Sequence, residues 1–262
     1  MAVLQEKTHE LSIVMLNYHT DDYTLKLLDT LPPRKGLEII IVDNSLHQGL
    51  EEKLPKRDDI IYIFSGRNFG FAGGNNQGIQ KAHGEWIMLL NNDTLSNTRD
   101  LFKLIEITKE ADYLVSTPRL INSDSSWQQS VGYFDSHQKN IVNHLFARPR
   151  YLDKDIKKNS PVDFAHFTAV LFHRSVFETV GLLDDSTYFM YFEDIDFCQE
   201  MKKKNISVLY VPEITLTHFG GASSDLDKKQ KNINYTTSLR RYLEKHRGSL
   251  ISDLNSVAKI LK

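Results

Sequence analysis

The chain has 262 residues, of which 40% are hydrophobic and 25% charged, an ordinary composition for one large α/β domain or two small ones. Its one cysteine, Cys198, excludes an internal disulfide and a cysteine-based zinc site, and no apolar run approaches the roughly 18 residues of a membrane span. The first ten residues lack the apolar core of a signal peptide, so we expect a cytoplasmic protein.

The net charge of −2 is unevenly distributed along the chain. Residues 226–262 carry nine Lys or Arg and three acidic residues, a net charge of +6, which leaves −8 for residues 1–225. An acidic body argues against general binding to nucleic acid, whereas a basic tail suits an anionic surface.

Short apolar runs alternate with helical patterns in the first half of the chain. The runs are bounded by turn-forming residues, as in strands that are covered on both faces of a parallel sheet. We expect strands at 11–16, 37–42, 60–64 and 86–90, with helices at 21–31 and 99–110. This order, with its short connections, predicts a parallel α/β sheet flanked by helices.

Polar and acidic clusters follow these strands. Asp43 closes the second strand, and Asn91-Asn92-Asp93 closes the fourth. Ligands of α/β folds bind at the carboxyl ends of the strands, so both acids are expected to converge on one crevice. Asp93 offers a hard oxygen ligand to a divalent cation. Alternatively, this segment is a turn that caps the helix after it.

A glycine-rich segment, residues 70–78, follows the third strand and leads into a helix that ends near His83. It is not the Gly-x-Gly-x-x-Gly pattern, and it does not follow the first strand as a dinucleotide motif would. One interpretation is a tight turn. The other is a loop whose glycines let backbone N–H groups approach a nucleotide diphosphate, with hydrogen bonds added by Asn68, Asn75 and Asn76.

The second half of the chain is less regular. Residues 122–160 are polar, as in a long loop that covers a cleft, and a basic tail with two predicted helices, 234–247 and 249–261, ends the chain. Between them we expect strands at 113–116, 162–172, 208–211 and 214–218, and helices at 174–180 and 194–204. His218 ends the last strand, where it is either a hydrogen-bonded structural residue, a metal ligand or a phosphate donor.

The second acidic cluster, Glu193-Asp194-Ile195-Asp196, opens a helix directly after an aromatic run. Acidic residues at a helix N-terminus are favoured by the macrodipole, so capping alone could explain them. An apolar wall beside a carboxylate also raises its pKa, which suits a general base.

Five of these segments occur in an order that resembles a known family. They are Val42-Asp43-Asn44, Asn68-Phe-Gly-Phe-Ala-Gly-Gly-Asn75, Leu90-Asn-Asn-Asp-Thr94, Phe189-Met-Tyr-Phe-Glu-Asp-Ile-Asp196 and His218-Phe-Gly-Gly-Ala-Ser223. Together they are similar to the family 2 glycosyltransferases of the GT-A fold, specifically a rhamnosyltransferase-like branch from bacterial polysaccharide assembly. The resemblance covers roughly residues 11–225, and Asn17-Tyr18-His19 departs from the Thr-Tyr-Asn frequent in the family.

The resemblance implies a role for each matching residue. Asp93 alone would bind the Mg²⁺ or Mn²⁺ that holds the donor diphosphate, with His218 close to the metal, and Asp194 would be the general base. Tyr191 and Glu193 would lie on the acceptor side. Donor binding would fall to Asn17, Tyr18, Asp43, Asn68, Gly74, Asn75, Asn92 and Asp93.

The implied activity is an inverting, metal-dependent transfer of a sugar from a nucleotide-diphospho-sugar, with dTDP-L-rhamnose as the first expectation. The acceptor would be a glycan or a lipid-linked saccharide. A UDP-sugar donor, a nucleotidyltransferase on a related sheet and a non-catalytic glycan- or nucleotide-binding module are the alternatives. A nucleotidyltransferase would need a glycine- and basic-rich loop near the first strand, which residues 17–22 do not have.

The resemblance also implies a division of the chain. Residues 1–225 would form the GT-A domain, with a nucleotide-sugar-binding half at 11–117 and an acceptor-side half at 118–225, and residues 226–262 a basic helical tail. The apolar stripe of helix 249–261 would pack on the body or on a second subunit of a homodimer, or contact the inner face of a membrane as a peripheral anchor.

Overall fold

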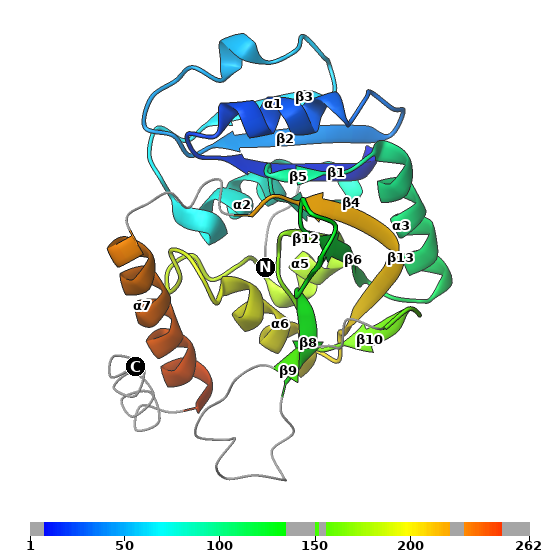
Figure 1. Ribbon diagram of the computed structural model, residues 1–262, viewed down its shortest axis with the longest axis vertical. Coiled ribbons are helices and arrows are strands. Elements are labelled where there is room, and N and C mark those ends of the chain that lie inside the picture. The colour runs from blue at the N-terminus through cyan, green and yellow to red at the C-terminus, as the bar shows by residue number, and fades with distance from the viewer. Residues whose placement is uncertain (1–7, 135–149, 152–155, 221–227, 248–262) are drawn as a thin grey trace.

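The computed structural model of the protein describes residues 8–134, 150–151, 156–220 and 228–247 (Figure 1). The helices are α1 (Asp21–Asp29), α2 (Gly70–Lys81), α3 (Thr98–Glu110), α5 (Ser175–Val180), α6 (Glu193–Lys203) and α7 (Lys228–Arg247), with a 3₁₀ turn at Glu51–Lys53. The strands are β1 (His9–Asn17), β2 (Leu37–Asp43), β3 (Ile60–Phe64), β4 (Gly84–Leu90), β5 (Thr94–Leu95), β6 (Val115–Ile121), β7 (Trp127–Gln128), β8 (Val131–Tyr133), β9 (Arg150–Tyr151), β10 (Ser160–Val162), β11 (Phe164–Ala165), β12 (Ala169–His173) and β13 (Val208–His218).

One mixed sheet runs through the molecule in the order β10-β13-β6-β12-β4-β1-β2-β3. The pairs β4–β1, β1–β2, β2–β3 and β13–β6 are parallel, whereas β12 is antiparallel to both of its neighbours. The expected α/β architecture with a mostly parallel central sheet is therefore confirmed. The antiparallel strand β12 joins the parallel half to the second half, and β11, β8 and β9 form a small separate sheet.

Helices cover both faces of the sheet. Leucines of α1 and α3 pack on one face, against alternate residues of β1, β2 and β4 such as Met15, Ile41 and Met88. Helices α2, α5, α6 and α7 cover the opposite face, where Val14, Val42 and the neighbouring strand residues lie. Because side chains alternate across a strand, each buried strand contributes to both hydrophobic clusters.

The glycine-rich segment 70–78 is a helix and not a turn, so the expectation of a turn leading into a later helix is wrong. Gly70 begins α2 with a positive φ of 73°, and an added Cβ there would lie 2.0 Å from the backbone oxygen of Phe189. A Cβ on Gly74 would lie 2.7 Å from Asn44 Nδ2. The glycines therefore allow α2 to approach the strand ends and the segment before α6 closely.

Gly78 gives a direct test of this packing. A Cβ added there would lie 2.3 Å from Val14 Cγ1 on β1. We expect Gly78→Ala to destabilise the protein by about 1–2 kcal/mol, because overpacking costs about 1–3 kcal/mol and outweighs the helix propensity gained, about 1 kcal/mol. Urea unfolding measures the difference. Gly49→Ala is the matched control, since a Cβ there meets nothing within 4 Å; equal stability of the two variants would contradict the prediction.

Two further expectations on the second half need correction. The strand expected at 162–172 is three short strands, β10, β11 and β12, of which β11 belongs to the small sheet. The two strands expected on either side of Pro212 are one continuous strand, β13. Its pairing with β6 shifts register between Val211 and Thr215, and such an irregularity is where a sheet tolerates proline.

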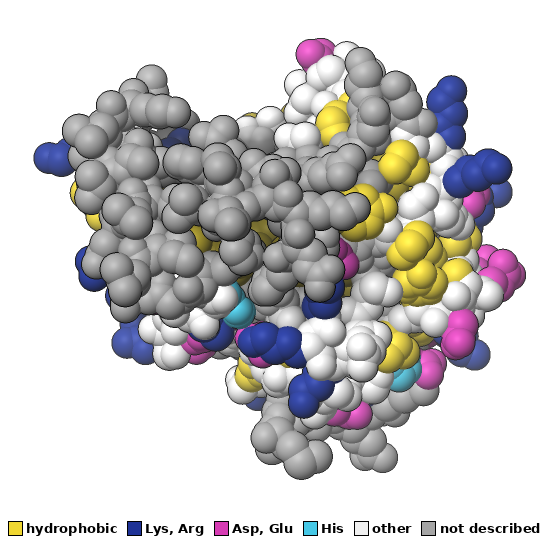
Figure 2. Space-filling view, turned by 90° about the horizontal axis from the view of Figure 1, so that it is seen from below, with side chains coloured by type: hydrophobic (Ala, Val, Ile, Leu, Met, Phe, Trp, Pro, Cys, Tyr) yellow, Lys and Arg dark blue, Asp and Glu magenta, His cyan; other side chains and the backbone are white. Residues whose placement is uncertain are grey.

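The first tail helix, α7, packs on the body of the protein and begins earlier than expected, at Lys228. Tyr242 and Leu243 are buried against the cluster that also contains α6 residues. The second predicted tail helix, 249–261, lies outside the described residues. Among the described residues on the face seen in Figure 2, Lys and Arg side chains lie at several separate places. Among the described residues, no helix combines the length and the hydropathy that crossing a bilayer requires.

Candidate active site

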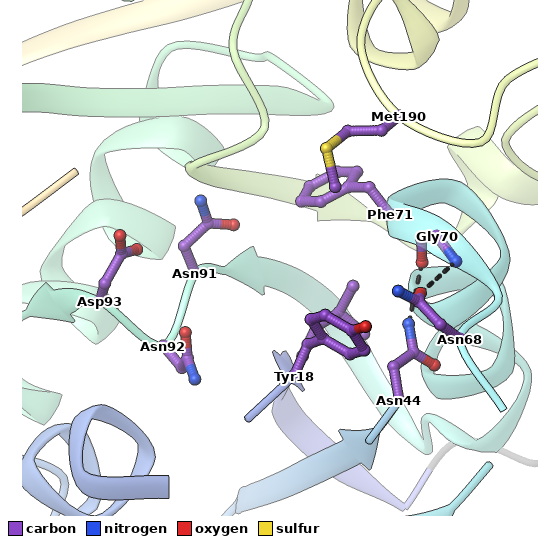
Figure 3. A pocket seen from close by; sticks show the side chains of 10 residues that line it. Tyr18, Asn44, Asn68, Gly70, Phe71, Asn91, Asn92, Asp93 and Met190 are labelled. Carbon is purple, nitrogen blue, oxygen red and sulfur yellow. Dashed lines mark hydrogen bonds between the residues drawn. The ribbon is translucent and has the colours of Figure 1, made fainter. Parts of the chain in front are cut away.

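A pocket opens at the carboxyl ends of β1, β2 and β4 (Figure 3). It holds about 530 Å³ of empty space, a volume that includes the open solvent at its mouth. The lining comes from segments that are far apart in the sequence, and amide groups predominate among its polar side chains. The residues are Leu16, Tyr18, Asn44, Asn68, Gly70, Phe71, Asn91, Asn92, Asp93 and Met190.

Asp93 and His218 lie together at one end of the pocket. Asp93 Oδ1 and His218 Nε2 are 3.1 Å apart, and both side chains are largely buried. The other ring nitrogen of His218, Nδ1, is 2.8 Å from Gln128 Oε1. An amide oxygen only accepts, so Nδ1 carries a proton and Nε2 is the nitrogen that faces Asp93. The predicted proximity of these two residues is therefore present, together with Gln128, which the sequence analysis missed.

Asn17, Asp43 and Asn92 form a buried hydrogen-bond network behind the pocket. Asn17 Nδ2 donates to Asp43 Oδ1 at 3.0 Å, and Asn92 Nδ2 donates to the hydroxyls of Thr20 and Thr24 at 2.7 and 2.9 Å. The strand ends thus converge as expected. However, Asp43 is almost fully buried and does not line the pocket, where its neighbour Asn44 lies instead. The Asn92 side chain points toward α1, although the residue is part of the lining (Figure 3).

Tyr62 is a further hydrogen-bond donor to Asp43. Its hydroxyl donates to Asp43 Oδ2 at 2.9 Å, and burial together with this hydrogen bond raises the pKa of Tyr62. With Asn17, the Ser45 amide and Tyr62 as donors, both carboxylate oxygens of Asp43 are occupied within the protein. In this structure Asp43 therefore stabilises the strand ends from which Tyr18 and Asn44 reach the pocket.

The remaining donor-side predictions divide into two groups. Tyr18 and Asn68 line the pocket, and Asn68 Oδ1 accepts a hydrogen bond from the Gly70 amide at 2.8 Å (Figure 3). Gly74 and Asn75 do not line it. Gly74 has no side chain that would clash with Asn44. Asn75 is buried in α2, and its side-chain amide donates to the Phe71 carbonyl at 2.9 Å. Asn76 likewise binds Leu183 and Asp185, on the chain that leads to the second acidic cluster.

The second acidic cluster begins α6, and its two first carboxyl groups differ in environment. Glu193 is buried, its Oε2 has no hydrogen-bond partner among the described residues, and burial followed by the charge of Asp194 raises the pKa of Glu193 well above 4.5. Asp194 is partly exposed, and its Oδ1 accepts from the Ile195 amide at 2.7 Å. The pKa increase that the sequence suggested for this cluster therefore falls on Glu193, because Glu193 is the buried residue. Asp194 is the carboxyl group that solvent reaches.

The segment before α6 connects this cluster to the pocket. Met190 lines the pocket beside Phe71, and the Phe71 amide donates to the Phe189 carbonyl at 2.9 Å (Figure 3). Tyr191, one of the acceptor-side predictions, follows Met190; burial and then the charge of Glu193 raise its pKa. Met190, Phe71 and Asn91 lie in segments that carry the family resemblance, but no individual role was predicted for them, because an apolar or amide side chain is not distinctive of a site.

Comparison with known proteins places the chain in a family. The model of glycosyl transferase family 2 matches residues 12–181. The hexosyltransferase Agl10 of low-salt glycan biosynthesis in Haloferax volcanii is 31% identical over 211 residues, which cover 79% of this chain and 66% of that protein, just under two thirds of its length. Rhamnosyltransferase WbbL of Escherichia coli K12 is 27% identical over 219 residues, 79% of this chain and 82% of that protein.

Solved structures agree on the fold. GalNAc-T7, crystallised with UDP, GalNAc and Mn²⁺, has a TM-score of 0.62 at 16% identity, with 98% of this chain and 55% of that chain covered. TarS of S. aureus, residues 1–349, has a TM-score of 0.55 at 14% identity, covering 91% of this chain and 73% of that chain. The chain therefore belongs to glycosyl transferase family 2 and has the GT-A fold.

Proposed function

We propose that the protein is an inverting, divalent-metal-dependent hexosyltransferase of glycan biosynthesis. It moves a sugar from a nucleotide-diphospho-sugar, in the first place dTDP-L-rhamnose, to a glycan or lipid-linked saccharide. The observation that carries the proposal is the pocket at the strand ends, where the Asp93–His218 pair lies beside a lining rich in amides. The relatives named rhamnosyltransferase favour rhamnose, although at 24–27% identity; a UDP-sugar donor is the second candidate.

The Asp93–His218 pair has the chemistry of a divalent-cation site. A carboxylate oxygen and an imidazole nitrogen, 3.1 Å apart and both largely buried, suit Mn²⁺ or Mg²⁺, and the hydrogen bond from Nδ1 to Gln128 orients the ring as a metal-binding histidine requires. Asp93 and His218 would hold the ion. When bound, it neutralises the negative charge of the nucleoside diphosphate leaving group.

Asp194 is the proposed general base. Its carboxylate takes the proton from the acceptor hydroxyl as that oxygen attacks the anomeric carbon from the face opposite the diphosphate, and this single displacement inverts the configuration. Partial exposure of Asp194 supports access of an acceptor. Glu193, buried beside it, is proposed as an acceptor-side residue, and its burial raises its pKa. Tyr18 and Asn68 are proposed donor contacts at the other end of the pocket.

The division of the chain and its wider partners are part of the proposal. We place the nucleotide-sugar-binding half at 11–117 and the acceptor-side half at 118–225, with the tail at 226–262. Contact of the tail with a second subunit or with the inner face of a membrane is supported by its net charge of +6 and by the apolar stripe of 249–261.

A donor panel tests the proposed function. Purified protein is incubated with dTDP- and UDP-sugars and with an acceptor extract, with and without Mg²⁺ or Mn²⁺, and release of the nucleoside diphosphate is measured. We expect release with one donor class and its loss on chelation with EDTA. Binding of nucleoside diphosphate without turnover of any donor would favour a non-catalytic binding module.

A further inference from the structure

Helix α7 lies outside the region matched by the family model, yet it contacts the chain that forms one wall of the pocket. We name residues 184–192 the wall segment. Met190 is its contribution to the pocket lining, and Glu193 and Asp194 follow it directly. Five residues of α7 form hydrogen bonds with the wall segment or with α6. They are Ser238, Arg241, Tyr242, Lys245 and His246.

The wall segment is held from both sides at successive carbonyl groups. The Phe71 amide of α2 donates to the Phe189 carbonyl at 2.9 Å, and the Ser238 hydroxyl of α7 donates to the Met190 carbonyl at 2.7 Å. With both carbonyls anchored, the Met190 side chain points into the pocket beside Phe71 (Figure 3). The position of Met190 therefore depends on α7 as well as on α2.

The two residues after Met190 have a backbone conformation that non-glycine residues rarely adopt. Tyr191 and Phe192 have φ values of 71° and 69°, both in the left-handed region, which costs free energy and persists only where the surroundings enforce it. Their rings pack on Tyr235 of α7, at centroid distances of 5.7 and 5.3 Å, and the Phe192 ring also lies 5.4 Å from that of Tyr242. Helix α7 supplies the packing that offsets this strain.

The other end of α7 is anchored on Asp196 of α6. Lys245 Nζ lies 2.9 Å from Asp196 Oδ2, and Oδ1 is contacted by His246 Nε2 at 2.6 Å and by the Tyr188 hydroxyl at 3.2 Å. Asp196, Glu200 and His246 could also be grouped as cation ligands. The Lys245 ammonium already neutralises Asp196, however. The cluster is therefore better explained as a set of contacts that connects α7 with α6 and the wall segment.

We propose that α7 is a positioning element of the active site, which holds the strained Tyr191–Phe192 turn so that Met190 lines the pocket and Asp194 keeps its place at the start of α6. The inference rests on the proposed function of Asp194 as the base. Ser238 and Tyr235 do not line the pocket, and they act on it through the wall segment. They are therefore positioning residues, and their loss acts on the chemical step more than on the binding of the nucleotide.

Single substitutions in the full chain test this proposal. Ser238→Ala removes the hydrogen bond to Met190, and Tyr235→Ala removes a ring that is 38% exposed, so neither change should unfold the protein. We expect each to lower kcat for nucleoside diphosphate release by roughly 3- to 10-fold, the effect of one hydrogen bond or ring contact. The Kd of UDP or dTDP with Mn²⁺, measured by calorimetry, should stay within about twofold. Thr237→Ala, an exposed hydroxyl one residue away, is the matched control.

A second readout separates this inference from the proposed function. Hydrogen exchange of peptides that cover residues 188–195 should accelerate in Ser238→Ala and Tyr235→Ala but not in Thr237→Ala. If the parent protein turns over no donor, the proposed function fails while the exchange result still tests α7. Unchanged kcat in both variants of an active enzyme, or exchange in this segment equal to that of the control, would overturn the proposal.

Discussion

Asp194→Asn is expected to lower kcat for sugar transfer by about 10²- to 10⁴-fold, the usual contribution of a general base. The amide is nearly the same size as the carboxylate but cannot take the acceptor proton. Donor binding should remain nearly intact, because Asp194 does not line the pocket in which Tyr18, Asn68 and Asp93 lie. Turnover and the Kd of nucleoside diphosphate are measured on the same preparation. Near-normal turnover would remove Asp194 from the mechanism.

Glu193→Gln is the informative companion of this variant. Because burial raises the pKa of Glu193, glutamine resembles the neutral form that burial favours, and we expect kcat to change by less than about fivefold. The raised pKa has a consequence for stability. The parent loses stability relative to Glu193→Gln as the pH rises from about 4.5 through the folded-state pKa, since ionising the buried carboxyl opposes folding. Thermal unfolding across that range measures this divergence, and a gap independent of pH would contradict it.

Asp93→Asn is expected to lower turnover by about 100- to 1000-fold, because a bound divalent cation is worth several kcal/mol of charge stabilisation and each 1.4 kcal/mol is tenfold. The asparagine keeps the size of the side chain but removes the charged ligand beside His218. Mn²⁺ binding in the presence of UDP or dTDP, followed by electron paramagnetic resonance, should weaken in parallel. This readout does not depend on knowing the acceptor.

Two controls make the result for Asp93 specific. Gln128→Ala should weaken Mn²⁺ binding by about 10- to 100-fold, a smaller loss, since it removes only the hydrogen bond that orients His218. Asp100→Asn, a change of the same kind at a partly exposed position of α3 outside the pocket, should leave both Mn²⁺ binding and turnover unchanged. Full metal-dependent activity of Asp93→Asn would place the cation at other residues.

The parallel half of the fold could be predicted because its signals are local. Apolar runs with polar ends identified β1, β2, β3 and β4 to within two residues, and the rule that ligands bind at carboxyl strand ends brought the segments of Asp43 and Asp93 to one edge. The pairing of Asp93 with His218 was expected only through the family resemblance. Their proximity depends on the pairing of β13 with β5, and the hydrophobic periodicity of the sequence does not predict this pairing.

The glycine-rich segment shows where local reasoning fails. Glycine has a low helix propensity, so a turn was the natural expectation for residues 70–78. In the folded protein, α2 must pass close to Val14, Asn44 and Phe189, and a helix with side chains at Gly70, Gly74 and Gly78 would not fit there. Tertiary packing therefore overrides propensity, and the same glycines that weaken the helix in isolation make its position possible.

The sequence by itself determined the α/β class, the strand ends that meet at the pocket and the family, and it predicted acidic residues for the chemistry. Only the tertiary structure decided which side chains face the pocket, that Gln128 orients His218, and that α7 supports the wall segment before Asp194. Gln128 and Ser238 lie 90 and 48 residues from the groups they contact. Contacts over such separations follow from how sheet and helices pack as a whole, and they leave no local pattern in the chain.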